Sequence, residues 1–176
     1  FLLISPEKMV KEGWLQPLDI ELPHAFPDEK VDYGEVGKLK LSCLKKAFAR
    51  VTSLNADYEN FCSENSYWLE DHSLFVALKE SYKGAVWTDW PPGARNREVE
   101  FLNDQKMQLR EAIDFEKFVQ YIFFGQWMSL KKYCNDKGIE IFGDLPIYVT
   151  HDSSDVWANP ENFKLGGDGN PLLVAG

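Results

Sequence analysis

The chain has 176 residues, of which 44% are hydrophobic and 14% aromatic, and a formal net charge of −9 at pH 7. A domain of this length buries roughly 70% of the surface of its unfolded chain, so this composition supports a packed core and argues against disorder. Nucleic acids and anionic membranes are bound by clustered Lys and Arg, so the acidic balance argues against both partners. It is compatible with a neutral partner such as a sugar.

Cysteine usage bears on the location of the protein, and the chain ends bear on its length. Cys43, Cys62 and Cys134 are far apart and form no C-x-x-C pair, so we expect neither a structural disulfide nor a zinc site. A reducing, cytoplasmic location is the simpler expectation. No signal-peptide pattern and no stretch of membrane-spanning length is found. Phe1 and Gly176 both lie inside apolar runs, so we expect a piece of a longer protein.

The first 34 residues predict one short helix between irregular segments. Residues 1–5 are strand-like, and Ser5 followed by Pro6 is typical of a helix start that runs to Gly13. The segment 14–34 contains three prolines and scattered acids, so it predicts a long loop.

Helical periodicity dominates the middle of the chain. Apolar residues recur on one face over 35–51 and over 67–84, where Gly84 is the expected stop. The clearest pattern is 115–138, which carries a broad apolar stripe, a predicted cap at Asp114 and a glycine at its end.

A strand-like run, "IEIFGDL" at 139–145, follows the third helix. A helix, a glycine and a short apolar run form a βα-type unit, which predicts an α/β fold with a parallel sheet or barrel. Ligands bind at the carboxyl ends of such strands, where Asp144 lies. An aspartate at a strand end also caps turns, and both interpretations stay open.

The stretch "THDSSDVW" after that strand is rich in polar residues. Three interpretations arise: metal ligation by His151, Asp152 and Asp155; a hydrolase triad with Ser153; or a sugar-contacting wall completed by Trp157. Asx turns explain the acids better than a metal site does, and no G-x-S-x-G elbow supports the triad. The sugar-contacting wall remains, beside the alternative that Trp157 only plugs the loop onto the domain.

Two further stretches have simpler interpretations. In the predicted loop 86–97, Trp87 and Trp90 are expected to staple the loop onto helices, with stacking on a glucan as the alternative. The run "LGGDGNP" at 165–171 lacks the acids of an EF-hand and the lysine of a P-loop, so it predicts a tight turn between two short strands.

Several of these motifs together resemble the 4-alpha-glucanotransferases known as amylomaltases or disproportionating enzymes, a branch of the alpha-amylase clan. The resemblance rests on "GDLPIYV", "HDSSDVWANPENF" and "DGNPLLVAG", with support from "FLLISPE", "WLEDHSLFVALKE" and "FVQYIFFGQW". It implies a fragment of a (β/α)8 TIM barrel with a large, mainly helical insertion. Residues 1–13 would be a barrel-associated strand and helix, 14–112 the insert, 113–150 a barrel helix and the third barrel strand, and 151–176 an active-site loop region.

The resemblance also implies a reaction. The family transfers maltooligosaccharide segments between alpha-1,4-glucans by a retaining mechanism, which uses two carboxylates about 5–5.5 Å apart. It implies a supporting role for Asp144 in the catalytic centre and substrate contacts from His151, Asp152, Ser153 and Trp157. No metal or organic cofactor is implied, and the partners are the glucan substrate and the rest of the parent barrel.

The family's nucleophilic Asp, its acid/base Glu and a further substrate-binding Asp have no matching motif in this sequence. We therefore expect the 176 residues alone to be inactive. Thr150 and Ser154 stand where the family tends to have Ala, which bears on specificity. The alternatives are a non-catalytic carbohydrate-binding or scaffold module, acting through Trp87, Trp90 and Trp157, and an amylase-like glycoside hydrolase.

Overall fold

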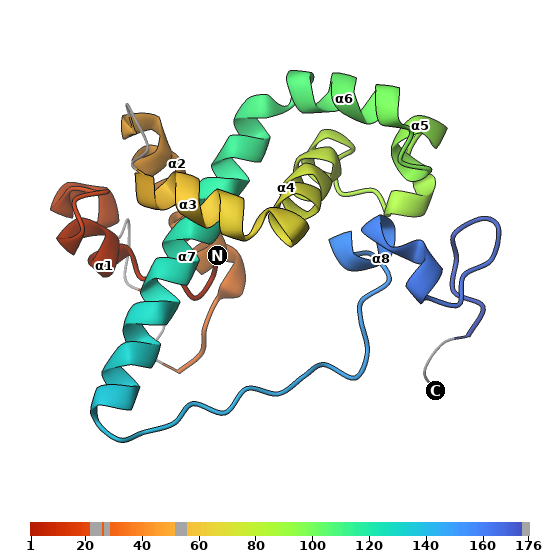
Figure 1. Ribbon diagram of the computed structural model, residues 1–176. Coiled ribbons are helices and arrows are strands. Elements are labelled where there is room, and N and C mark those ends of the chain that lie inside the picture. Colours follow the sequence, from red (N-terminus) through yellow and green to blue (C-terminus); the bar gives the residue numbers. More distant parts are fainter. Residues whose placement is uncertain (22–25, 27–28, 52–55, 174–176) are drawn as a thin grey trace. The chain divides into compact units, whose positions relative to one another are not determined.

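The computed structural model describes residues 1–21, 26, 29–51 and 56–173, and over these residues the protein is helical (Figure 1). The described chain contains no β-strand; a single antiparallel bridge joins Leu165 and Pro171. The α-helices and short 3-10 helices (η), in chain order, are α1 Pro6–Lys11, η1 Pro17–Ile20, α2 Tyr33–Arg50, α3 Ala56–Glu64, α4 Ser66–Ser81, η2 Trp87–Asp89, α5 Pro92–Arg95, α6 Val99–Gln108, α7 Arg110–Asp136, α8 Ser154–Ala158 and η3 Pro160–Asn162.

The chain divides into two compact units. Residues 1–63 and 118–142 form the first unit, and residues 64–117 and 143–176 form the second. Both units are therefore assembled from chain segments far apart in sequence. None of the helices in the described residues is both long enough and apolar enough to cross a membrane.

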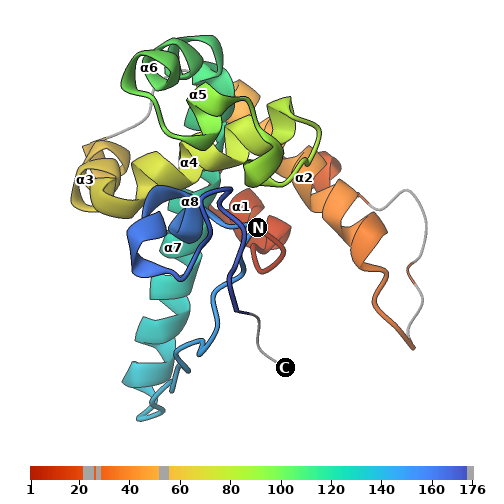
Figure 2. The same ribbon diagram turned by 90° about the vertical axis from the view of Figure 1, so that its right-hand side faces the viewer.

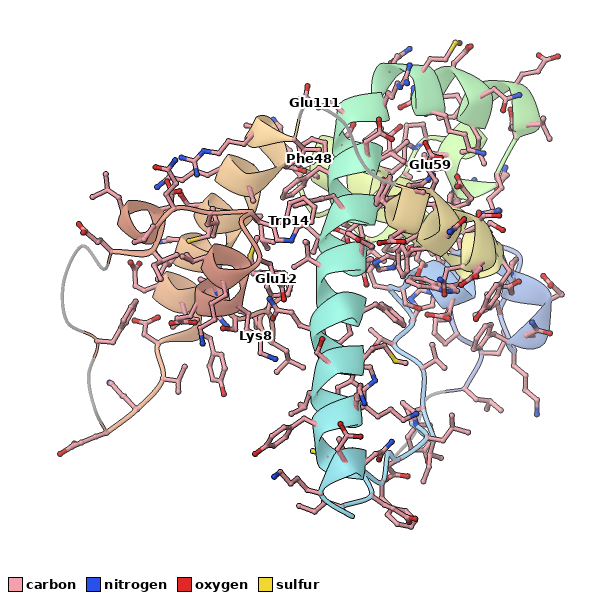
Figure 3. The ribbon with its side chains drawn as sticks, turned by 60° about the vertical axis from the view of Figure 1, so that its left-hand side comes forward. Lys8, Glu12, Trp14, Phe48, Glu59 and Glu111 are labelled. Carbon is pink, nitrogen blue, oxygen red and sulfur yellow. The ribbon has the colours of Figure 1, made fainter. Side chains whose placement is uncertain are left out.

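In the first unit, α7 supplies the main apolar face. Phe118, Val119 and Ile122 are buried, and the rings of Trp14 and Phe48 lie 5.5 and 5.6 Å from that of Phe118. Figure 3 labels Trp14 and Phe48 beside α7. Aromatic pairs at such distances contribute about 0.5–1.5 kcal/mol beyond their burial. The side-chain amide of Gln126, in α7, also holds the backbone at the start of α1.

The Gln126 side chain is buried. Its Oε1 accepts the Ser5 backbone N–H at 2.7 Å, and its Nε2 donates to the Ser5 carbonyl at 3.1 Å. The Ser5 hydroxyl accepts the Lys8 backbone N–H at 3.2 Å, so Ser5 is the helix cap that the sequence predicts. Asp19, in η1, binds Arg50 at the end of α2 and accepts the Gln16 backbone N–H.

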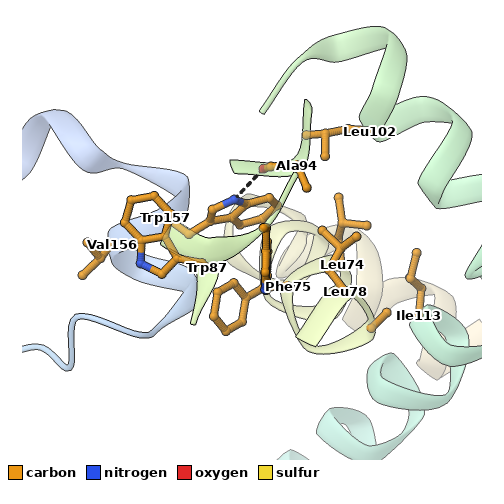
Figure 4. Close-up of a cluster of buried hydrophobic side chains, with 11 residues drawn as sticks. Leu74, Phe75, Leu78, Trp87, Ala94, Leu102, Ile113, Val156 and Trp157 are labelled. Carbon is orange, nitrogen blue, oxygen red and sulfur yellow. Dashed lines mark hydrogen bonds between the residues drawn. The ribbon is translucent and has the colours of Figure 1, made fainter. Parts of the chain in front are cut away.

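The second unit is built around α4. Leu69, Leu74, Phe75, Ala77 and Leu78 are buried on several sides of this helix, as expected for a helix at the centre of a unit. Its core also contains aromatic residues from η2 and α8 (Figure 4).

The predicted helices over 35–51, 67–84 and 115–138 are confirmed as α2, α4 and α7. Gly84 follows α4 with a φ of +80°, a left-handed conformation that glycine adopts without strain. The predicted cap at Asp114 is wrong, because α7 begins at Arg110. Asp114 lies one turn inside it and approaches the Arg110 guanidinium to 3.6 Å.

Other predictions need correction. Residues 1–5 form a turn rather than a strand, and the predicted loops 14–34 and 86–97 contain η1, η2 and α5. Residues 22–25 and 27–28 of the first loop lie outside the described residues. Helices α3 and α6 were not predicted, because their sequences lack a clear apolar stripe. The division into barrel and insert stays a prediction.

The predicted strand at 139–145 is not formed. In Figures 1 and 2 the segment between α7 and α8 carries neither a coil nor an arrow. A strand is stabilised by the backbone hydrogen bonds of a neighbouring strand, and the described residues offer none. The predicted strand is therefore wrong for the described chain, which is helical and shows no part of the predicted α/β sheet or barrel.

Candidate functional site

Asp144 lies in an exposed segment. Residues 139–149 are exposed throughout, including the apolar side chains of Phe142 (91%) and Ile147 (90%). The Asp144 carboxylate makes no hydrogen bond or ion pair with any residue that the structure describes. Within this chain its position is therefore set by the backbone alone.

His151 joins two segments of the second unit. Its Nε2 lies 2.9 Å from the carbonyl oxygen of Gly169, which can only accept, so Nε2 carries the proton. The His151 carbonyl accepts the indole N–H of Trp87 at 2.9 Å, and the two rings lie 5.4 Å apart. His151 thus connects η2 with the turn 165–171.

Asp152 is bound to both α4 and η2. One carboxylate oxygen pairs with the ammonium of Lys79, and the other accepts the Trp87 backbone N–H at 3.4 Å. Lys79 also donates to the Ala85 carbonyl at 2.8 Å. Both side chains of the ion pair are partly buried, so salt screens it less than an exposed pair.

Two serines fix the start of α8. The Ser153 hydroxyl accepts the Val156 backbone N–H at 3.4 Å and caps the helix. The Ser154 hydroxyl lies 3.3 Å from Nδ1 of His72, whose Nε2 lies 3.3 Å from Glu116. Since a carboxylate can only accept, Nε2 of His72 is protonated, and a neutral ring accepts from Ser154 through Nδ1.

Trp157 lies in the core of the second unit. Its side chain is 1% exposed, and its indole N–H donates to the Ala94 carbonyl at 2.9 Å (Figure 4). The rings of Phe75 and Trp90 lie 5.7 and 5.8 Å away, and the Arg97 guanidinium lies 4.3 Å from the ring centroid. The observed role of Trp157 is to plug α8 onto α4 and α5; contact with a sugar stays a prediction.

The predicted turn at 165–171 is confirmed, closed by a single bridge in place of two strands. Asp168 accepts from the side chain and the backbone N–H of Asn170, and these hydrogen bonds lower the pKa of the Asp168 carboxyl. Gly169 has a φ of +82°, and an added Cβ would lie 2.8 Å from the Trp87 ring. Only glycine fits this close approach.

A cavity of about 370 Å³ opens beside this turn. It is mostly apolar, and its ionisable members are His151, Lys164 and Tyr148. Its lining comprises Tyr148, Val149, His151, Val156, Phe163, Lys164, Leu165, Pro171 and Leu173. The cavity adjoins the segment that carries Asp144, because Tyr148 and Val149 are among its lining residues.

The polar residues of the loop do not converge on one point. His151, Asp152 and Ser153 bind Gly169, Lys79 and the α8 backbone in turn, so they do not form a hydrolase triad. The described residues contain no group of His, Cys, Asp or Glu side chains arranged to hold a metal ion. Sequence reasoning missed Lys79 and His72, because they lie more than 70 residues from Asp152 and Ser154 and no local pattern marks them.

A family model described as 4-alpha-glucanotransferase matches residues 1–171. The chain belongs to the 4-alpha-glucanotransferase family. The 4-alpha-glucanotransferase of Synechocystis sp. is 39% identical over 180 residues, covering 99% of this chain and 36% of the relative. That of Aquifex aeolicus is 40% identical over 176 residues, covering 100% of this chain and 35% of the relative.

A solved structure gives the same result for the fold. The amylomaltase from Streptococcus agalactiae, in complex with acarbose, matches with a TM-score of 0.91 and 35% identity, covering 99% of this chain and 36% of that chain. The chain thus spans about a third of the length of the relatives it matches. Its helices correspond to a segment of a larger fold.

Proposed function

We propose that this chain is part of a 4-alpha-glucanotransferase that transfers maltooligosaccharide segments between alpha-1,4-glucans. The observation that carries the proposal is the family match over residues 1–171. The relatives are about three times longer. We therefore assign the chemistry to the longer enzyme and expect the 176 residues alone to be inactive. The proposed location is the cytoplasm.

In the longer enzyme, residues 139–145 form the third strand of a (β/α)8 barrel. The support is physical: Phe142, Leu145 and Ile147 are almost fully exposed in this chain. Burying an apolar side chain of this size contributes about 1.5–3 kcal/mol, so these residues gain much from neighbouring strands. Strand pairing would also satisfy the backbone groups of this segment.

Asp144 then lies at the carboxyl end of a barrel strand, where substrates bind in such barrels. Its freedom from protein partners in this chain leaves the carboxylate available for sugar hydroxyls or for the reacting groups. We assign it a supporting role, because a retaining mechanism needs a nucleophile and an acid/base, and both are supplied by other parts of the longer enzyme. Sugar contacts from His151, Asp152, Ser153 and Trp157 belong to the same proposal.

The test is an assay of the longer enzyme with maltotriose. Transfer yields glucose together with glucans longer than maltotriose, and chromatography resolves both products. The 176-residue chain serves as the matched sample and should yield neither. An intact longer enzyme that leaves maltotriose unchanged contradicts the proposal, and so does turnover by the 176 residues alone.

The same assay separates a glycoside hydrolase, which yields glucose and maltose without longer products. A carbohydrate-binding module is the other candidate. Its expected platforms, Trp87, Trp90 and Trp157, are all buried, which favours the enzyme segment. Titrating the 176-residue chain with maltoheptaose should leave its tryptophan fluorescence unchanged, whereas saturable quenching supports the binding module.

A further inference from the structure

We propose that Lys79, in α4, is a positioning residue for glucan transfer, acting by holding the loop 151–154 that follows Asp144. The inference rests on the proposed function and adds a residue that lies outside the loop itself. Lys79 does not touch the substrate in this account; it acts through Asp152.

The contacts of Lys79 are the first support. Its ammonium pairs with the Asp152 carboxylate and donates to the Ala85 carbonyl at 2.8 Å. One charged group thus ties the C-terminal part of α4 to two separate loops. Because both partners of the ion pair are partly buried, removing the ammonium leaves the Asp152 carboxylate poorly solvated and favours displacement of the loop.

The second support is that two other residues, His72 in α4 and Trp87 in η2, also hold the loop. His72 lies seven residues before Lys79, about two turns earlier and therefore on the same face of α4. It contacts Ser154 at 3.3 Å, so α4 holds the loop at Asp152 and again two residues later. Trp87 supplies two more hydrogen bonds, to the His151 carbonyl and the Asp152 carboxylate.

The third support concerns what the loop carries. His151 lines the cavity of about 370 Å³ and holds the Gly169 carbonyl of its neighbouring turn. Displacing Asp152 therefore also disturbs one wall of this cavity. A misplacement of about 1 Å in a substrate-positioning group can lower catalysis by about 100-fold, so an anchor of this kind influences rate without contacting the sugar.

The experiment uses the longer enzyme and four variants. Lys79→Met removes the charge but keeps the length of the side chain, Lys79→Arg keeps the charge, and Asp152→Asn removes the partner charge. The fourth variant combines Lys79→Met with Asp152→Asn. Lys106→Met is the control, because Lys106 is an exposed lysine in α6 for which the structure gives no ion pair.

We expect Lys79→Met to lower kcat/KM for maltotriose by about 10- to 100-fold, mainly through kcat. Lys79→Arg should recover most of this loss, and Lys106→Met should match the unaltered enzyme. The combined variant should be no worse than the poorer single variant, because both changes break one interaction. Additive losses, or a Lys79→Met enzyme with unaltered kcat/KM, overturn the proposal.

A second measurement separates this inference from the proposed function. Amide hydrogen exchange in the 176-residue chain should become faster at residues 151–158 in the Lys79→Met variant and remain slow in Lys106→Met. Unchanged exchange at these residues overturns the positioning role even where transfer is observed. Absence of transfer by the unaltered longer enzyme contradicts the proposed function, while exchange still decides whether Lys79 holds the loop.

Discussion

Replacing Trp157 by alanine is expected to destabilise the second unit strongly. A buried Trp side chain removes about 200–250 Å² of apolar surface from water, which corresponds to about 5–6 kcal/mol at ~25 cal/mol per Å². Collapse around the site recovers part of this, so we expect a loss of about 3–5 kcal/mol in the free energy of unfolding. The variant also leaves the Ala94 carbonyl without its 2.9 Å donor.

Urea unfolding followed by far-UV circular dichroism measures this effect. With a slope of about 2 kcal/mol per molar urea, the midpoint of the transition should fall by about 1.5–2.5 M. Trp157→Phe keeps much of the packing but loses the N–H donor, so its midpoint should lie between those of the unaltered chain and Trp157→Ala. Tyr67→Ala is the control in the same unit, because Tyr67 is 83% exposed and its removal should change stability by less than about 0.5 kcal/mol. A midpoint for Trp157→Ala equal to that of Tyr67→Ala refutes the packing role.

Two further predictions concern single side chains. Binding to Arg50 and to the Gln16 backbone N–H lowers the pKa of Asp19 from 3.8 to about 2, so its contribution to stability is complete above about pH 4 and is lost as the pH falls through about 2. An NMR titration of the carboxyl carbon checks this, and a midpoint near 3.8 contradicts it. Gly169→Ala should lower the free energy of unfolding by about 1–3 kcal/mol, through backbone strain and a clash with Trp87. Gly167→Ala should leave it unchanged, because an added Cβ there meets open space. Urea unfolding compares the two variants.

Local signals in the sequence predicted the long helices well. The apolar stripe of 115–138 and the Ser5–Pro6 helix start lead directly to α7 and α1, because these features depend on residues within one or two turns. The start of α7 was missed by about one turn, since Asp114 pairs with Arg110 inside the helix rather than capping it.

Features that depend on distant partners could not be predicted in this way. The strand at 139–145 needs neighbouring strands, and the described chain offers none, so its apolar pattern results in an exposed segment. At the loop, the residue types were compatible with sugar binding. Lys79 lies 73 residues from Asp152, and His72 lies 82 residues from Ser154. No local pattern in the sequence points to contacts over such separations.

The most direct test of the central claim is Asp144→Asn in the longer enzyme, with Glu140→Gln as the control from the same exposed segment. Asparagine keeps the shape of the side chain and removes its charge. If Asp144 supports the catalytic centre, kcat for transfer from maltotriose should fall by about 100-fold or more with little change in thermal stability. Glu140→Gln should retain the unaltered rate. An Asp144→Asn enzyme with the kcat of the unaltered enzyme contradicts the account.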